Sequence, residues 1–166
     1  MSSAQFQVEQ REPITYCALP VTVRMNDIGA RVAVAYEQLD LYLASRGIQP
    51  NGPGIIRYRL LEMGRPFTIE VGWAIPENTW IDLPYVADVL PAGRYVVGSH
   101  LGSFAVLDEV TSEALMWADL QDLTFDMSPS DAGDHWASRA ELYLEAPKLG
   151  PQGLGGPVEI CMKVIG

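Results

Sequence analysis

Basic residues are scarce in this chain of 166 residues. Lys and Arg number 11 against 21 Asp and Glu, which gives a formal net charge of -10 at pH 7. Sequence-independent binding of nucleic acid needs a Lys/Arg surface that releases counterions from phosphates, and no basic run exists here. We therefore predict no direct nucleic-acid binding. Cationic or neutral partners fit the charge better, although charge alone does not choose a function.

Long hydrophobic runs are also absent. The longest uncharged apolar stretch, residues 95–107, contains Gly, Ser and His and is well short of the ~20 residues that span a bilayer. The polar start, residues 1–12, lacks the basic beginning, apolar centre and small-residue exit of a secretory signal. We predict a cytoplasmic protein without membrane contact.

Cysteine and histidine each occur twice. Cys17 and Cys161 lie in apolar, strand-like contexts without a CxxC pair, so we predict reduced, buried thiols. His100 and His135 lie in no pattern of metal ligands, which predicts no metal site. No phosphate-binding loop and no GxGxxG before a helix occurs, so no cofactor is predicted. The absence of a GxSxG elbow also argues against a serine hydrolase.

Hydrophobic residues make up 48% of the chain, which is enough for one globular domain over residues 1–166. In the first half, hydrophobic spacing and turn residues predict a strand at 14–24, a helix between Asp27 and Gly47, and strands at 55–61 and 67–75. In the second half they predict a strand at 86–100 kinked at 91–93, a helix capped by Ser103, a polar loop at 124–137, and strands at 138–145 and 158–165 joined by a Pro/Gly-rich link.

The two halves repeat each other in order and in residues. The segment Ile69–Ile75 corresponds to Val158–Val164, so one module covers about residues 12–76 and the other about 86–166. Neither module could cover its own sheet or protect its edges. We predict an α+β fold in which duplicated strand-helix-strand-strand modules form a mainly antiparallel sheet. Both helices are expected on one face of the sheet, with a ligand groove on the other.

The segment from residue 139 to 145 alternates strictly. Alternation places Ala140, Leu142 and Leu144 on one face, expected under the helices, and Glu141, Tyr143 and Glu145 on the other, expected in the groove. Two carboxylates around a phenol suit a cation whose flat body stacks on aromatic rings. The alternative is a solvated strand face on which Glu141 pairs with Arg139 or Arg57.

The chain resembles the GyrI-like (gyrase-inhibitor-like) effector-binding family, which also supplies the drug-sensing domain of some bacterial transcription activators. The resemblance covers nearly everything from Glu12 onward. It is carried by the repeated element order and by the segments Leu90–Tyr95, Gly102–Phe104 and Ala140–Tyr143. It implies an acidic residue at the bottom of an aromatic-lined pocket between the halves, where lipophilic cations bind. By motif position that residue is Glu141.

The resemblance implies further pocket positions at Tyr143, Phe104 and Tyr36, and the internal repeat relates Tyr58 to Tyr143. Core packing is the alternative role for each of these aromatic residues. Trp73 alternates with Ile69, Val71 and Ile75, which directs its side chain toward the helices and favours a core role. Trp136, in the polar loop, is expected either to cover the pocket or to anchor its loop.

Three functions remain open. The first is a stand-alone binding protein for amphipathic, aromatic or cationic compounds, because a bound cation relieves the desolvation of a pocket carboxylate. The second, implied by some members of the family, is a hydrolase of electrophilic cyclopropane-type toxins with Glu141 as base and Tyr143 as its partner. The third, implied by the family name, is a protein partner of a topoisomerase. Residues 1–12 are too short for a helix-turn-helix, so we expect no DNA-binding regulator working alone.

Overall fold

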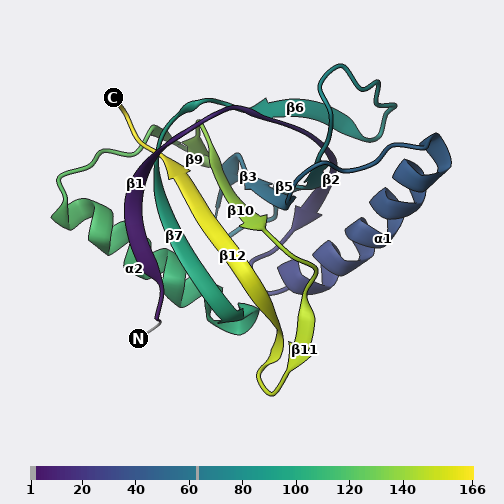
Figure 1. Ribbon diagram of the computed structural model, residues 1–166. Helices are drawn as coiled ribbons and strands as arrows, with labels where there is room; N and C mark the ends of the chain where they lie inside the picture. Colours follow the sequence, from purple (N-terminus) through teal and green to yellow (C-terminus); the bar gives the residue numbers. More distant parts are fainter. Residues whose placement is uncertain (1–2, 63) are drawn as a thin grey trace.

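The computed structural model describes residues 3–62 and 64–166. Within them the chain forms two α-helices, α1 (Ile28–Arg46) and α2 (Leu107–Leu120), and a short 3-10 helix, η1 (Phe104–Val106), directly before α2 (Figure 1). The strands are β1 (Gln5–Arg11), β2 (Ile14–Val23), β3 (Gly54–Tyr58), β4 (Leu60–Leu61), β5 (Phe67–Ala74), β6 (Val86–Leu90), β7 (Gly93–Ser103), β8 (Met127–Ser130), β9 (Gly133–Trp136), β10 (Arg139–Tyr143), β11 (Lys148–Gly150) and β12 (Gly153–Lys163). Neither described helix has the length and apolar character needed to cross a membrane.

Most of the described strands form one antiparallel sheet in the order β1-β7-β12-β10-β3-β5-β2-β6, and β11 joins it as the hairpin partner of β12. A small second sheet has the order β4-β9-β8. The predicted α+β class, with two helices and a mainly antiparallel sheet, is confirmed.

The main sheet has the same strand order on both sides of its centre. From the centre outward, β10, β12 and β7 lie on one side, and β3, β5 and β2 lie on the other. In each set the outermost of these three strands leads into a helix, β7 into α2 and β2 into α1. The two sets meet where β3 pairs with β10, and there Glu141 lies directly opposite Ile56.

Both helices begin and end near the predicted signals. Gly47 adopts the left-handed conformation with φ 67° after the last residue of α1, where a residue without Cβ is not strained. The Ser103 side chain accepts a hydrogen bond from the backbone N–H of Ala105 at 3.1 Å. This cap begins η1 rather than α2, which follows after one 3-10 turn.

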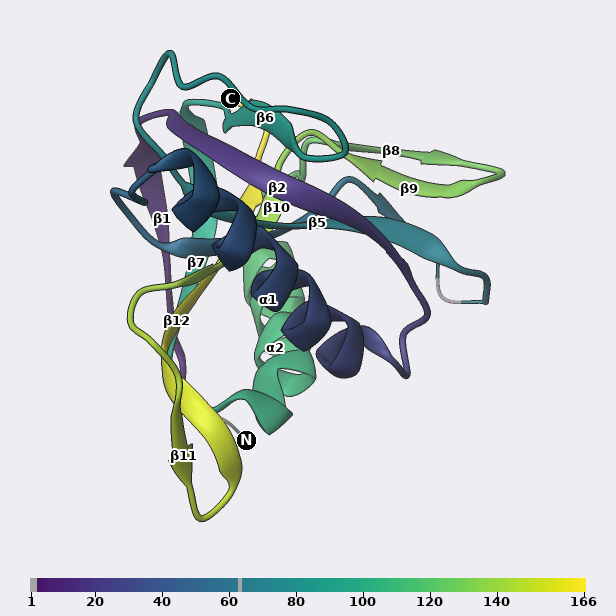
Figure 2. The same ribbon diagram turned by 90° about the vertical axis from the view of Figure 1, so that its right-hand side faces the viewer.

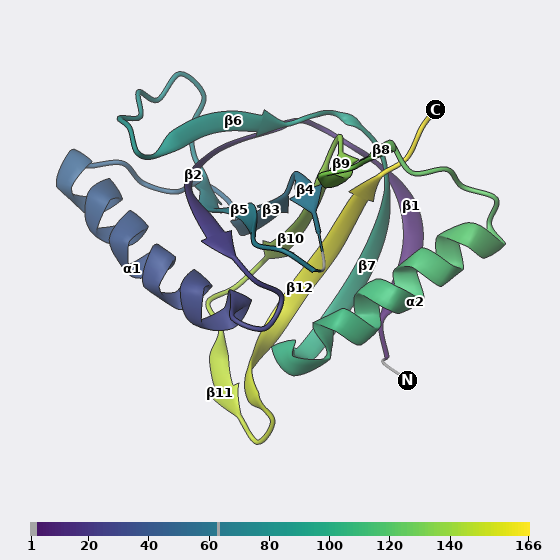
Figure 3. The same ribbon diagram turned by 180° about the vertical axis from the view of Figure 1, so that it is seen from behind.

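The two helices pack on the same face of the sheet, toward its two sides. α1 buries Ala35, Leu39 and Leu43, and α2 buries Val110, Ala114 and Ala118. α1 contacts β2 and β5, whereas α2 contacts β7. Figure 3 shows α1 and α2 on opposite sides with the middle strands between them.

The predicted position of the groove was wrong. Ile56 and Ile160, which flank Glu141 on β3 and β12, pack in the clusters beneath α1 and α2 respectively. Tyr143 contacts both clusters, so Glu141 and Tyr143 face the helices rather than the opposite side. The alternation was correct, but the helices flank the middle strands instead of covering them. Polar side chains of β10 are therefore accommodated between α1 and α2.

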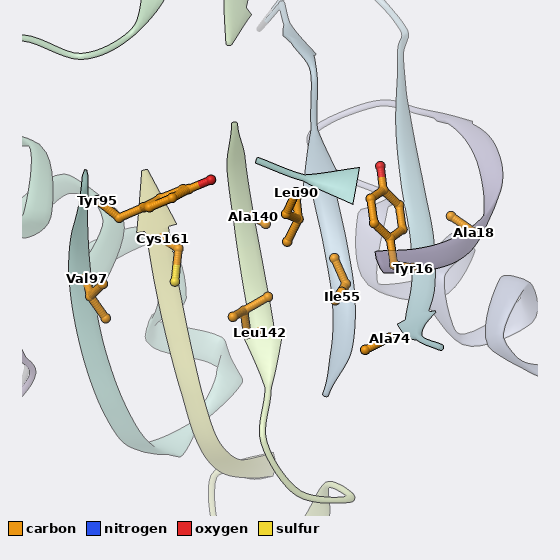
Figure 4. Packing of buried hydrophobic residues seen from close by; sticks show 10 residues of the cluster. All are labelled: Tyr16, Ala18, Ile55, Ala74, Leu90, Tyr95, Val97, Ala140, Leu142 and Cys161. Atoms are coloured by element: carbon orange, nitrogen blue, oxygen red, sulfur yellow. The ribbon is translucent and has the colours of Figure 1, made fainter. Parts of the chain in front are cut away.

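The face opposite the helices is an apolar core enclosed by the curved sheet. Ala140 and Leu142 pack there with Tyr16, Ile55 and Tyr95 from three further strands (Figure 4). The other members of this cluster are Ala18, Ala74, Leu90, Val97 and Cys161. Because the sheet closes over its own apolar face, helices are not needed to cover it. Cys17 and Cys161 are both buried free thiols.

Several strands differ from the prediction. β1 forms in the polar start, where it pairs with β7, and β8 and β9 form a hairpin within the predicted loop at 124–137. The predicted strand at 86–100 is two strands, because the chain breaks at Pro91 and Ala92. β6 then pairs with β2 at one edge of the sheet, and β7 pairs with β12 near the other. The strand of Glu141 ends at Tyr143, which leaves Leu144 and Glu145 exposed outside it.

Candidate functional site

The carboxylate of Glu141 lies at the middle of the main sheet with a phenol on each of its oxygen atoms. The Tyr143 hydroxyl donates to Oε1 at 2.5 Å, and the Tyr58 hydroxyl donates to Oε2 at 3.2 Å. Tyr143 follows Glu141 by two residues on β10, and Tyr58 follows Ile56 by two residues on the antiparallel strand β3. The two phenols therefore approach from opposite directions along the strands, as the internal repeat predicts.

This environment shifts the ionisation of all three groups. Burial raises the pKa of Glu141 above 4.5, although hydrogen bonds from Tyr143 and Tyr58 and the charge of Arg139 act to lower it. Burial and the neighbouring carboxylate raise the pKa of both phenols well above 10.0. The phenols therefore remain protonated donors. A partly buried carboxylate that loses solvation in this way favours binding of a cation or a proton.

Aromatic rings from α1 and η1 lie around the phenol of Tyr143. Phe104 meets Tyr143 edge-on with ring centroids 5.1 Å apart. Tyr36 of α1 packs in the same cluster as Tyr143, and its hydroxyl donates to the carbonyl of Gly72 at 3.0 Å. Gly54 makes this close arrangement possible, because a Cβ there would lie 3.0 Å from the Tyr36 hydroxyl oxygen.

Trp73 extends this group of rings along α1. Its ring meets Tyr36 edge-on at 5.7 Å, and its Nε1 donates to Asp40 at 2.8 Å. The side chain points toward the helix side, as predicted, and is only partly buried. Glu141, Tyr143, Tyr58, Tyr36, Phe104 and Trp73 are thus brought together through direct contacts or shared packing.

Trp136 shares the cluster beneath α2 with Phe104 and Tyr143, but its ring pairs with neither of theirs. It ends β9, is 8% exposed, and packs against Phe125 in the cluster beneath α2 with ring centroids 5.3 Å apart. On its other side the guanidinium of Arg139 lies 4.7 Å from the centre of the Trp136 ring. Arg139 therefore links Trp136 to the face of β10 that carries Glu141. Sequence reasoning weighed Arg139 only as an ion-pair partner of Glu141.

The predicted alternative of an ion pair between Glu141 and Arg57 is wrong. Arg57 points to the opposite face of the sheet, where it is 4% exposed and donates to the Tyr16 hydroxyl and to the backbone carbonyls of Val89 and Ala137. Arg59 and Glu70 complete this network around Tyr16. The one-residue offset between Ala140 and Glu141 explains the difference, since Arg57 lies opposite Ala140.

A hollow of about 360 Å³ lies beside the β11–β12 hairpin. The hairpin protrudes from the rest of the sheet (Figure 2). The hollow is lined by Leu101, Glu145, Lys148, Leu149 and backbone of the glycine-rich hairpin, and by none of the seven predicted site residues. Apart from the Pro/Gly-rich link, no sequence pattern predicts this hollow. Any binding experiment must therefore distinguish this hollow from the surroundings of Glu141.

Several solved structures share this α+β fold. The C-terminal domain of EcmrR matches with a TM-score of 0.74 at 13% identity, over 98% of this chain and 98% of that domain. SAV2435 bound to tetraphenylphosphonium matches with a TM-score of 0.61 at 16% identity, over 98% of this chain and 94% of that one. A hydrolase from Listeria innocua matches with a TM-score of 0.59 at 10% identity, over 97% of this chain and 92% of that one.

These likenesses confirm the fold that the resemblance to GyrI-like effector-binding domains implies. EcmrR in its complex with DNA matches as well, with a TM-score of 0.74 at 14% identity, but this chain spans 57% of that protein's length. No protein-family model matches the chain, and no curated protein matches it in sequence.

Proposed function

We propose that this chain binds amphipathic, aromatic small molecules, cationic ones among them, at Glu141. The observation that carries the proposal is a partly buried carboxylate held by two phenols between the helices, with further aromatic rings beside it. A lipophilic cation gains by restoring the lost solvation of the carboxylate, and its aromatic groups gain by stacking. SAV2435, which has the same fold, was solved with such a cation bound.

The test is a thermal-shift comparison of tetraphenylphosphonium with triphenylphosphine oxide, which is neutral and of similar shape. Ligands that bind the native state raise the unfolding temperature. We expect a larger shift with the cation in the wild type, and we expect Glu141→Gln to remove that preference.

The matched control is Glu145→Gln, which removes the same charge from an exposed position that lines the hairpin hollow. This variant is expected to keep the preference for the cation. A preference that survives in Glu141→Gln and disappears in Glu145→Gln would place binding at the hollow and refute the proposal.

A second candidate function is hydrolysis of an electrophilic ligand at the same site. The raised pKa of Glu141 brings a carboxylate nearer to the range of a general base, and Tyr143 donates to it from 2.5 Å. Apart from Tyr58, which donates to the other carboxylate oxygen, no further described residue is hydrogen-bonded to the Glu141 carboxylate, so we rank the enzyme below the binding protein. Product in excess of one equivalent of protein, absent in Glu141→Gln, would reverse that order.

A further inference from the structure

Arg139 is a cation in the candidate site without a bonded partner. It lies on the same face of β10 as Glu141 and Tyr143, and its side chain is partly buried. Among the described residues its guanidinium takes part in no hydrogen bond or ion pair, and its contact is with the face of the Trp136 ring at 4.7 Å. Its nitrogen atoms are not sealed from solvent, in contrast to Nε of Arg57.

Three other partly or fully buried arginines of the described chain are bonded, whereas Arg94 on β7 is not. Arg11 donates twice to Glu159, Arg57 donates to Tyr16 and two carbonyls, and Arg59 donates to Glu70. Buried charges in proteins are ordinarily paired in this way because desolvation is costly. At Arg139 the loss of solvation lowers the pKa, and no bonded carboxylate offsets it. The donors of Arg139 are thus left available.

Trp136 leaves those donors well oriented. A guanidinium stacked on an aromatic ring keeps the N–H groups at its edges free for a second partner, and a carboxylate fits that edge with two parallel hydrogen bonds. Trp136 is itself buried and packs against Phe125, so the guanidinium lies over a ring that is already held in place.

Arg139 and Glu141 are two residues apart on one strand face, which places their Cβ atoms about 7 Å apart. The charge of each influences the ionisation of the other. A ligand that carries only a positive charge gains from Glu141 and is repelled by Arg139. A ligand that also carries an oxyanion near its cationic centre satisfies both groups.

We propose that the site selects zwitterionic aromatic compounds, with the delocalised cation against Glu141 and the carboxylate bound to Arg139. This inference rests on the proposed function and specifies the class of ligand. It assigns a role in specificity to Arg139, which is not among the predicted site residues.

Rhodamine B and its ethyl ester test the inference, because they share the aromatic cation and differ in whether the carboxylate is free. Fluorescence titrations of the full chain would compare the wild type with Arg139→Met, Arg139→Lys and Glu141→Gln. We expect the wild type to bind rhodamine B about tenfold more tightly than the ester, which is the scale of one charge-assisted pair. Arg139→Met should bind the two dyes equally tightly, and Arg139→Lys should keep part of the preference for rhodamine B.

Arg31→Met is the matched control, because it removes the same charge from an exposed position on α1. The ratio of its affinities for the two dyes should equal that of the wild type. If Arg139→Met keeps the full ratio while Glu141→Gln loses binding of both dyes, the proposed function stands and this inference fails. If Arg139→Met does not fold, a wild type that favours the ester still overturns the inference. Failure of both dyes to bind the wild type would overturn the inference together with the proposed function.

Discussion

Each oxygen atom of the Glu141 carboxylate accepts one phenol hydrogen bond, and neither oxygen accepts a hydrogen bond from a cation among the described residues. Phenols stabilise the charged form less than an arginine would, so desolvation still dominates and raises the pKa. The site therefore holds a carboxylate that is fixed in position yet poorly neutralised.

The first prediction concerns the pH dependence of stability at this residue. The pKa of Glu141 is raised in the folded state. Protonation of Glu141 therefore contributes to the stability of the fold fully at pH below the unfolded-state pKa of 4.5, and this contribution is lost as pH rises through the folded-state pKa. Glu141→Gln removes this loss. We expect the unfolding temperature of the variant to rise relative to that of the wild type as pH increases above 4.5, as measured by thermal unfolding.

The groups that face Glu141, namely Tyr58, Tyr143, Arg139 and Asp108, are the same in both proteins, so the difference isolates this carboxylate. Glu145→Gln, at an exposed position, should follow the wild type at every pH. If the unfolding temperatures of the wild type and Glu141→Gln changed with pH in parallel, the raised pKa of Glu141 would be contradicted.

At the scale of elements, β2 and β5 approach each other too closely for a side chain at one position. A Cβ on Gly72 would lie 2.1 Å from the backbone carbonyl oxygen of Cys17. We expect Gly72→Ala to lower the free energy of unfolding by about 3 kcal/mol, because a backbone atom cannot move aside as a flexible side chain can.

Gly29→Ala in the first turn of α1 is the matched control. A Cβ there would meet nothing within 4 Å, so alanine's higher helix propensity should raise stability by about 0.5 kcal/mol. Denaturant unfolding of both variants measures the two effects. Equal and small changes in both would show that β2 and β5 can separate without cost.

The elements that sequence could predict are those whose signals are local. α1 has an apolar stripe and Gly47 at its end, and both predicted helices occur where the pattern placed them. β1 and the β8–β9 hairpin could not be predicted, because polar strands at an edge are stabilised by their partners rather than by their own residues.

The sequence predicted correctly which residues around Glu141 are neighbours, but it did not predict on which face of the sheet they lie. Alternation correctly grouped Glu141 with Tyr143, and the repeat correctly related Tyr58 to Tyr143. Which face the helices cover depends on how the whole sheet curves, and no local pattern contains that information. The stacking of Arg139 on Trp136 joins β10 to β9, whose strand was itself unpredicted.

At the scale of the whole molecule, the pairing of β3 with β10 makes one sheet from the two modules. The apolar core opposite the helices also draws on both, because Tyr16 and Ile55 pack with Tyr95 and Leu142. Neither module could leave the native state without exposing the core of the other.

We therefore predict that the chain unfolds in a single transition as one domain. Differential scanning calorimetry should give a calorimetric enthalpy equal to the van't Hoff enthalpy. Two resolved transitions, or a calorimetric enthalpy well above the van't Hoff value, would show that the modules are independent domains.

Glu141 and Ile56 occupy equivalent places on the two strands that meet at the centre of the sheet. Exchanging them, as Ile56→Glu with Glu141→Ile, would move the carboxylate across one strand spacing, about 4.8 Å, toward α1. The two modules are related by an approximate twofold axis at the centre of the sheet. A ligand with one charged end would then have to bind after half a turn about that axis. Under the proposed function, the orientation of a bound ligand is thus decided by which of two symmetry-related positions carries the charge.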